Sequence, residues 1–229
     1  MAAAVGPLHA LVVADGDIPT RPALDAVWPG WSEGLRLVVA ADGGARGAER
    51  LGFTIDLVVG DCDSLGEADI ARLAAAGVEI RRVPAEKDES DTELAMLASI
   101  ERGATALTVV GALGGSRLDH ALANVALLAL PALEGRPCEL LDPAARVRLL
   151  TAPATLDLPG QPGGIVSLVP FGDGVEGVTT DGLAYPLREE PLPAGPARGL
   201  SNVRLGDTAR VGLRAGRLLV IESPVTLSP

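Results

Sequence analysis

The stretch Asp56-Leu57-Val58-Val59-Gly60-Asp61-Cys62-Asp63-Ser64 joins a short apolar run to a loop that carries two carboxylates. A continuous apolar run of this length is typical of a strand that is buried on both faces, as in a parallel sheet. Residues 56–59 are therefore predicted to form such a strand. The acidic loop then lies at the carboxyl end of the strand, which is where ligands bind in open α/β sheets.

The same pattern continues in both directions from this stretch, over residues 1–140. The predicted strands are residues 9–14, 35–40, 56–59, 78–83, 107–110 and 138–141. Between them lie helix-like segments, at residues 45–51, 67–76, 92–102 and 118–130. Alternating strands and helices predict an α/β fold, with a mainly parallel sheet covered by helices on both faces.

The second part of the chain, residues 141–229, has a different pattern. Short β-type runs are separated by glycine and proline, at residues 147–150, 165–169, 177–180, 209–213 and 218–222. Residues 189–199 hold three prolines and are predicted to form a loop. We therefore expect a smaller C-terminal domain, an antiparallel β-sandwich.

Composition narrows the possible functions. The chain has 229 residues, of which 48% are apolar, and a formal net charge of −11. Such an acidic protein repels nucleic-acid backbones, so no nucleic-acid partner is expected. No apolar run reaches the roughly 20 residues of a membrane helix, and residues 1–13 lack the basic start of a signal peptide. Together with two isolated cysteines, these features predict a cytoplasmic protein without a membrane partner.

Asp61 and Asp63 form the most informative polar pair. Two carboxylates at positions i and i+2 of a loop can both turn toward one hard cation, and Mg²⁺ prefers such ligands together with phosphate oxygens. The alternative is a solvated turn in which Asp63 or Ser64 caps the next helix. The position after a strand favours the metal site. Asp42-Gly43-Gly44 also follows a strand, and there a helix N-terminus that favours anions competes with a plain turn.

Residues 87–93 are rich in charge. Ser90 and Glu93 have the spacing of a capping box, so a helix is predicted to begin here. Acidic residues in a first helical turn also complement the helix dipole. Capping does not explain the density of charge around it. We therefore interpret Ser90 and Glu93 as structural, and Lys87 and Asp91 as functional.

A glycine-rich loop at residues 111–116 leads into Arg117, which suits a phosphate cradle. On the helix that follows, Arg117, His120 and Asn124 share one face. Asp119 has an alternative, purely structural role as the partner of Arg117. The apolar side chains of this helix are expected to face the core: Leu118, Leu122 and Val125.

These groups together indicate metal-assisted transfer of a phosphate-containing group. The sequence has no GxxxxGK[ST] pattern and no protein-kinase signature, so the fold is not a P-loop fold.

Six blocks, in order along nearly the whole chain, closely resemble the thiamine pyrophosphokinase family. They are residues 41–45, 56–64, 87–91, 117–124, 182–187 and 199–202. The resemblance implies an α/β ATP- and Mg²⁺-binding catalytic domain, residues 1–140, and a β-sandwich thiamine-binding domain, residues 141–229. It also implies a homodimer with the active site at its interface. In that site the thiamine hydroxyl would attack the β-phosphorus of ATP, so that thiamine diphosphate forms and AMP leaves.

The resemblance also implies roles for individual residues. Catalysis would use the three metal ligands together with Arg117. Expected metal ligands are Asp61, Asp63 and Asp91. Expected ATP contacts are Asp42, Gly43, Lys87, Asp88, Thr92, Arg117, Asp119, His120 and Asn124. Expected thiamine contacts are Tyr185, Ser201 and Asn202. An aromatic face such as that of Tyr185 suits a flat, cationic ligand.

Three other functions remain open from the sequence. A diphosphokinase could act on another small alcohol, such as a hydroxymethylpterin, although the thiamine-type second domain argues against this. A non-catalytic sensor of nucleotide or thiamine is disfavoured because Asp61, Asp63 and Asp91 are all present. A Mg²⁺-dependent nucleotide hydrolase would need no thiamine.

Overall fold

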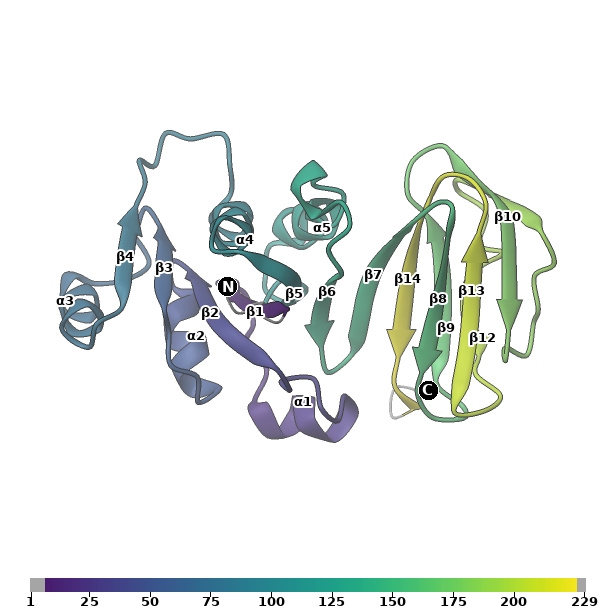
Figure 1. Ribbon diagram of the computed structural model, residues 1–229, viewed down its shortest axis with the longest axis horizontal. Coiled ribbons are helices and arrows are strands. Elements are labelled where there is room, and N and C mark those ends of the chain that lie inside the picture. The colour runs from purple at the N-terminus through teal and green to yellow at the C-terminus, as the bar shows by residue number, and fades with distance from the viewer. Residues whose placement is uncertain (1–6, 226–229) are drawn as a thin grey trace, which may run out of the picture. The chain divides into compact units, whose positions relative to one another are not determined.

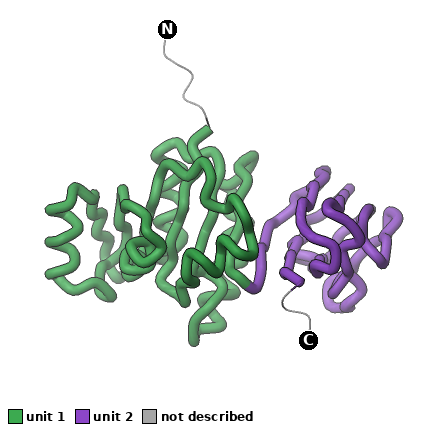
Figure 2. The backbone as a smooth tube through the Cα atoms, turned by 90° about the horizontal axis from the view of Figure 1, so that it is seen from below, with its two compact units in different colours: residues 1–143 green, residues 144–229 purple. Residues whose placement is uncertain are grey.

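The computed structural model describes residues 7–225, and the chain divides into two compact units, Met1–Pro143 and Ala144–Pro229 (Figure 2). Each unit has its own hydrophobic core.

The first unit is built on a six-stranded sheet in which all neighbouring strands are parallel. Its strands lie in the order β6-β5-β1-β2-β3-β4. Their bounds are β1 Leu8–Val13, β2 Leu35–Ala41, β3 Leu57–Gly60, β4 Glu79–Arg82, β5 Ala104–Val110 and β6 Cys138–Asp142. The chain builds the sheet outward from β1 to β4 and then crosses to the other side of β1. The loops after β1 and β5 therefore diverge at a topological switch point.

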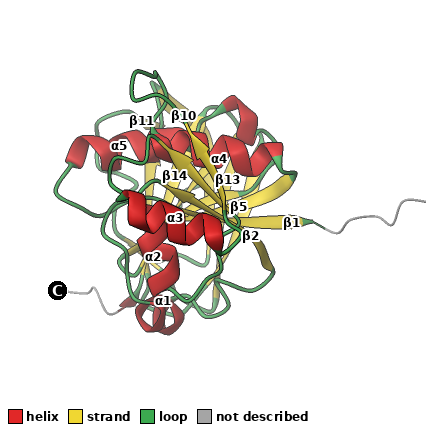
Figure 3. Ribbon diagram, turned by 90° about the vertical axis from the view of Figure 1, so that its left-hand side faces the viewer, coloured by secondary structure: helices red, strands yellow, loops and turns green. Residues whose placement is uncertain are grey.

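Helices cover both faces of this sheet, as the strand–helix alternation predicts. Figures 1 and 3 show α4 and α5 on one face and α1 and α2 on the other. The helix bounds are α1 Arg21–Val27, α2 Gly44–Arg50, α3 Glu67–Ala75, α4 Asp91–Glu101 and α5 Leu118–Leu127, followed by a 3₁₀ turn at Pro131–Leu133. The predicted α/β fold class is confirmed.

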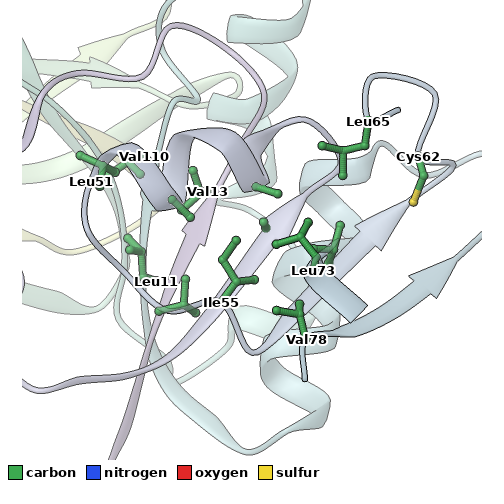
Figure 4. Close-up of a cluster of buried hydrophobic side chains, with 14 of the residues drawn as sticks. Leu11, Val13, Leu51, Ile55, Cys62, Leu65, Leu73, Val78 and Val110 are labelled. Atoms are coloured by element: carbon green, nitrogen blue, oxygen red, sulfur yellow. The ribbon is translucent and has the colours of Figure 1, made fainter. Parts of the chain in front are cut away.

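Apolar side chains alternate along the strands to fill one core beneath α1, α2 and α3. Leu11 and Val13 of β1 pack there with Leu73 of α3 (Figure 4). The residues between them, such as Val12, are buried against the opposite face. Burial on both faces explains why these strands are continuous apolar runs in the sequence.

Two helices of the first unit begin at clear N-caps. Helix α4 begins where the capping box predicts, since the Ser90 hydroxyl accepts the N–H of Glu93 at 3.1 Å. Helix α1 was not predicted. Thr20 caps it and Pro22 lies in its first turn, where the missing N–H of proline has no intrahelical partner to lose.

The second unit is a β-sandwich of two four-stranded antiparallel sheets, as predicted. Their orders are β12-β9-β14-β7 and β11-β10-β13-β8. The bounds are β7 Ala145–Thr151, β8 Ala154–Pro159, β9 Ile165–Pro170, β10 Gly174–Asp181, β11 Glu190–Pro193, β12 Asn202–Val203, β13 Thr208–Leu213 and β14 Arg217–Ser223. Side chains such as Val220 of one sheet and Val211 of the other share the core.

The prediction of a loop throughout residues 189–199 is wrong, because this segment contains β11. Leu192 is buried in the sandwich core, and β11 pairs only with β10 at the edge of its sheet. An edge strand tolerates proline because one side of its backbone needs no hydrogen-bond partner. Strands β8 and β12 were also not predicted.

Within residues 7–225 no helix is both long enough and apolar enough to cross a membrane.

Candidate active site

A cavity of about 730 Å³ opens at the carboxyl ends of the parallel strands, next to the switch point. The loops after β1, β2, β3 and β5 line it, together with the first turns of α4 and α5. This is the place that the sequence predicts, since each acidic or glycine-rich segment follows a strand.

Three carboxylates from three different loops converge in this cavity. Asp42 follows β2, Asp61 follows β3 and Asp91 begins α4. One oxygen atom of each lies within 4.8 Å of the others. Such a group of oxygen ligands suits a hard divalent cation. We call Asp42, Asp61 and Asp91 the carboxylate triad.

Asp42 is the most constrained member of the triad. Its backbone is left-handed, with φ of 43°, and its side chain is buried. The N–H of Ser64 donates to Asp42 Oδ2 at 3.1 Å, whereas Oδ1 is buried without a hydrogen-bond partner. Burial raises the pKa of Asp42, and the hydrogen bonds from Ser64 offset this only in part. A buried carboxylate oxygen without a partner is costly, so the site fits a bound cation.

Gly60 allows the triad to form. A Cβ at this position would lie 3.0 Å from the Cβ of Asp42 and 3.1 Å from Asp91 Oδ1. Its φ of 156° is also a conformation that residues with a side chain rarely adopt. The glycine at the end of β3 therefore lets two of the acidic loops approach each other.

Lys87 supplies the positive charge nearest to the triad. The side chain of Lys87 is largely buried, and its Nζ lies 2.8 Å from Asp91 Oδ1 and 3.7 Å from Asp61 Oδ2. Burial alone would lower the pKa of Lys87, but its pairs with Asp91 and Asp61 outweigh burial and raise it. Lys87 thus stays charged and offsets part of the negative charge at the triad.

Asp63 lies beside the triad and interacts with Asp42, although it is not one of the three clustered carboxylates. Its exposed carboxylate accepts the hydroxyl of Ser64 at 3.2 Å, and its N–H donates to Asp61 Oδ1 at 3.2 Å. Asp63 still lines the cavity. Among the described residues, the clustered carboxylates are Asp42, Asp61 and Asp91, so Asp42 joins two of the three predicted metal ligands. The role of Asp63 as a ligand stays a prediction.

Sequence reasoning missed the acidic loop after β1, whose Asp15 and Asp17 line the cavity. The Asp15 carboxylate lies above Gly43, where a Cβ would be only 2.4 Å from Oδ1. Burial raises the pKa of Asp15, and a hydrogen bond with Ser64 opposes this rise. Asp15-Gly16-Asp17 follows the first predicted strand, so the rule that found the other acidic loops could have found this one.

At the start of α5, Arg117 and Asp119 form an exposed ion pair. Arg117 Nε donates to Asp119 Oδ1 at 2.9 Å, and this contact lowers the pKa of Asp119 to about 2. Arg117 and His120 line the cavity, whereas Asp119 does not. Asn124 also lines it, and its buried amide donates to the carbonyl of Ala112 at 2.9 Å, which holds the glycine-rich loop.

The expectation that Leu118 and Leu122 face the core is wrong. They are 72% and 62% exposed, and Val125 is only half-buried. The polar face of α5 borders the cavity, so the apolar residues on its other side point outward.

The remaining predicted ATP residues lie in different settings. Thr92 lines the cavity and is buried. Gly43 is the N-cap of α2 beneath Asp15. Asp88 is exposed and is not among the lining residues.

The predicted thiamine residues belong to the second unit. Tyr185 is 61% exposed. Ser201 has a left-handed backbone, and its N–H donates to the Ser167 hydroxyl at 3.0 Å. Asn202 is buried and contacts the backbone of Tyr185.

The fold and the cavity together define a two-domain enzyme. Its first unit holds an acidic cavity, suited to a metal ion and phosphate groups, at the edge of a parallel sheet. Its second unit, which follows in the sequence, is a β-sandwich. Two family models match its two parts. One is described as the catalytic domain of thiamin pyrophosphokinase and matches residues 31–138. The other is described as its vitamin B1 binding domain and matches residues 154–218. The chain belongs to the thiamin pyrophosphokinase family.

Individual relatives agree with this assignment. The chain is 27% identical over 165 residues to thiamine pyrophosphokinase of Bacillus subtilis (strain 168), covering 72% of this chain and 76% of that protein. The crystal structure of thiamin pyrophosphokinase from Geobacillus thermodenitrificans is similar, with a TM-score of 0.78 and 28% identity, over 94% of this chain and 97% of that chain. A thiamin pyrophosphokinase family protein from Enterococcus faecalis has a TM-score of 0.79 and 27% identity, over 94% and 98% of the two chains.

Proposed function

We propose that the protein transfers the diphosphate group of ATP to the hydroxyl of thiamine, which gives thiamine diphosphate and AMP. The observation that carries this proposal is the cavity itself, where the carboxylate triad, Lys87 and a glycine-rich loop meet. Membership of the family supplies the two substrates.

The triad would hold a divalent cation, and Mg²⁺ suits an all-oxygen ligand set of this kind. When bound, this ion would neutralise charge on the phosphate groups of ATP. The unpartnered Oδ1 of Asp42 supports including it among the ligands with Asp61 and Asp91. Asp63, beside the triad, remains a candidate ligand.

The protein's own groups would act by positioning and by charge. Lys87 and Arg117 would stabilise negative charge as it builds on the transferring diphosphate, and backbone N–H groups of the loop before Arg117 would orient it. The same set of ATP contacts is proposed from the resemblance: Asp42, Gly43, Lys87, Asp88, Thr92, Arg117, Asp119, His120 and Asn124. Of these, Asn124 would act through the loop that it holds.

The domain roles follow the same division. Residues 1–140 would bind ATP and the metal ion, and residues 141–229 would bind thiamine through Tyr185, Ser201 and Asn202. The exposed Tyr185 ring offers a face for the flat thiamine cation.

We further propose a homodimer in the cytoplasm, with the active site at the dimer interface. The exposed pair Leu118 and Leu122, next to Arg117 of the cavity, supports an interface at α5. Cys62 and Cys138 are both free thiols, as expected in a reducing compartment.

The test is a product assay with ATP, Mg²⁺ and thiamine. We expect equal amounts of thiamine diphosphate and AMP, and a loss on the order of 100-fold or more in Asp61→Asn and Asp91→Asn. Asp173→Asn makes the same chemical change in an exposed turn and should leave the rate unchanged.

Other outcomes would contradict the proposal in different ways. Consumption of ATP without thiamine would indicate a hydrolase. Binding of both substrates without products would indicate a sensor. Turnover of a hydroxymethylpterin in preference to thiamine would indicate a different acceptor.

A further inference from the structure

The side chain of Asn202 holds the backbone of Tyr185 from both sides. Its Oδ1 accepts the N–H of Tyr185 at 2.9 Å, and its Nδ2 donates to the carbonyl of Tyr185 at 2.7 Å. Oδ1 also accepts the N–H of Val203 at 2.9 Å. Asn202 itself is only 6% exposed.

These contacts use most of the hydrogen-bonding capacity of the amide. A carboxamide oxygen has two lone pairs and its nitrogen two hydrogens. Both lone pairs and one hydrogen of Asn202 are already engaged with backbone groups. Asn202 therefore has no free acceptor, and one free hydrogen, with which to contact a ligand.

The neighbouring residues fix the rest of this loop. The hydroxyl of Thr180 accepts the N–H of Leu187 at 2.8 Å, and the N–H of Thr180 donates to the carbonyl of Leu187 at 3.0 Å. Leu183 and Leu187 are both buried. The loop is thus anchored on each side of Tyr185, which is itself 61% exposed.

We infer that Asn202 is a positioning residue that holds the backbone carrying the Tyr185 ring for thiamine, in place of the direct thiamine contact that the resemblance implies for it. The inference rests on the proposed function for its ligand, but the arrangement of Asn202 and Tyr185 can be tested without thiamine. A ring carried on a rigid loop loses less conformational entropy on binding than a ring on a mobile loop.

The experiment uses the fact that Tyr185 is the only tyrosine of the chain. Full-length protein labelled with 3-fluorotyrosine gives one ¹⁹F resonance, which reports on this ring. Asn202→Asp keeps the shape and both acceptor contacts, but it removes the donor and places a carboxylate oxygen against the carbonyl of Tyr185. We expect the resonance of the free protein to shift or broaden, and the KM for thiamine to rise about 10-fold with a smaller change in kcat.

Asn124→Asp is a matched control, because Asn124 is the only other asparagine and its amide also donates to a backbone carbonyl. It should leave the ¹⁹F resonance in place. Asn202→Ser is a second test variant, because serine is neutral and too short to reach both the N–H and the carbonyl of Tyr185. It should also change the ¹⁹F resonance. If neither Asn202 variant folds, Asn202 has a global role and the inference is wrong.

The remaining outcomes separate this inference from the proposed function. An unchanged free resonance with weakened thiamine binding would mean that Asn202 contacts thiamine directly, which overturns the inference. An unchanged resonance and unchanged KM would overturn it as well. If wild-type protein forms no thiamine diphosphate and thiamine leaves its resonance unmoved, the proposed function fails, while the free resonance of Asn202→Asp still reports on the positioning role.

Discussion

The ammonium group of Lys87 lies between the carboxylates of Asp61 and Asp91 and forms ion pairs with both. A metal ion bound by the same oxygens would be repelled by the ammonium group at this short distance. We therefore predict that Lys87→Met raises the affinity of the nucleotide-free protein for Mn²⁺ or Mg²⁺ several-fold, while it weakens ATP binding. Calorimetric titration of the metal and of ATP measures the two effects separately.

Lys87→Arg is the control, since it keeps the positive charge and should leave the metal affinity near that of the wild type. A lower metal affinity in Lys87→Met would instead mean that Lys87 helps to assemble the triad.

His9 offers a test of burial at a single titratable group. Burial lowers the pKa of His9 below 6.5, although the charge of Glu139 partly opposes this. The unfolded chain then binds a proton that the folded protein resists, so the contribution of His9 to stability is present above pH 6.5 and is lost as the pH falls toward the folded pKa. We predict that His9→Gln flattens the fall in stability with decreasing pH just below pH 6.5, measured by urea unfolding at several pH values.

His120 is the second of the two histidines and is exposed. His120→Gln is the control for loss of a histidine at an exposed position. If both variants have the same pH dependence as the wild type, burial of His9 does not affect stability.

At the scale of elements, the strands of the first unit and their acidic loops could be predicted because continuous apolar runs show where each strand ends. The approach of Asp42 to Asp61 and Asp91 could not be predicted. Spacing within one loop shows that Asp61 and Asp63 are neighbours, but it does not show that the loop after β2 brings Asp42 across. The short helix α1 was missed because proline at a helix start and proline in a loop look alike in sequence.

Residues 189–199 are a second segment whose structure could not be predicted from the sequence. Composition indicates a loop, yet β11 forms because Leu192 fills the sandwich core and an edge position tolerates its prolines. Edge positions are a property of sheet order, which short β-type runs do not reveal.

One buried ionic network joins elements of the second unit. Glu222 of β14 is buried, with Arg204 Nη2 at 2.7 Å and Arg148 Nη2 of β7 at 2.6 Å. We predict that Glu222→Gln destabilises the protein by about 3–5 kcal/mol, because it leaves buried guanidinium groups without their counter-charge. Denaturant unfolding followed by circular dichroism measures the change.

Glu176→Gln is the matched control. Glu176 pairs with Arg214 at 3.7 Å at an exposed position, where an ion pair contributes less than about 1 kcal/mol. Equal losses of unfolding free energy in the two variants would show that burial does not make the ion pairs of Glu222 more stabilising than an exposed pair.

At the scale of the whole molecule, the two exposed leucines of α5 decide between a monomer and a dimer. Leu118 and Leu122 lie one turn apart, so they form one apolar surface beside Arg117 of the cavity. If this surface is a dimer interface, Leu118→Glu with Leu122→Glu should convert a species of twice the chain mass into one of single mass, measured by light scattering after gel filtration. Ala74→Glu, on the exposed side of α3, should leave the mass unchanged.

Because we propose that the active site lies at the dimer interface, the monomeric variant should also lose most of its diphosphate transfer. A monomer with full activity would place the whole active site in one chain, and an unchanged dimer would place the interface away from α5.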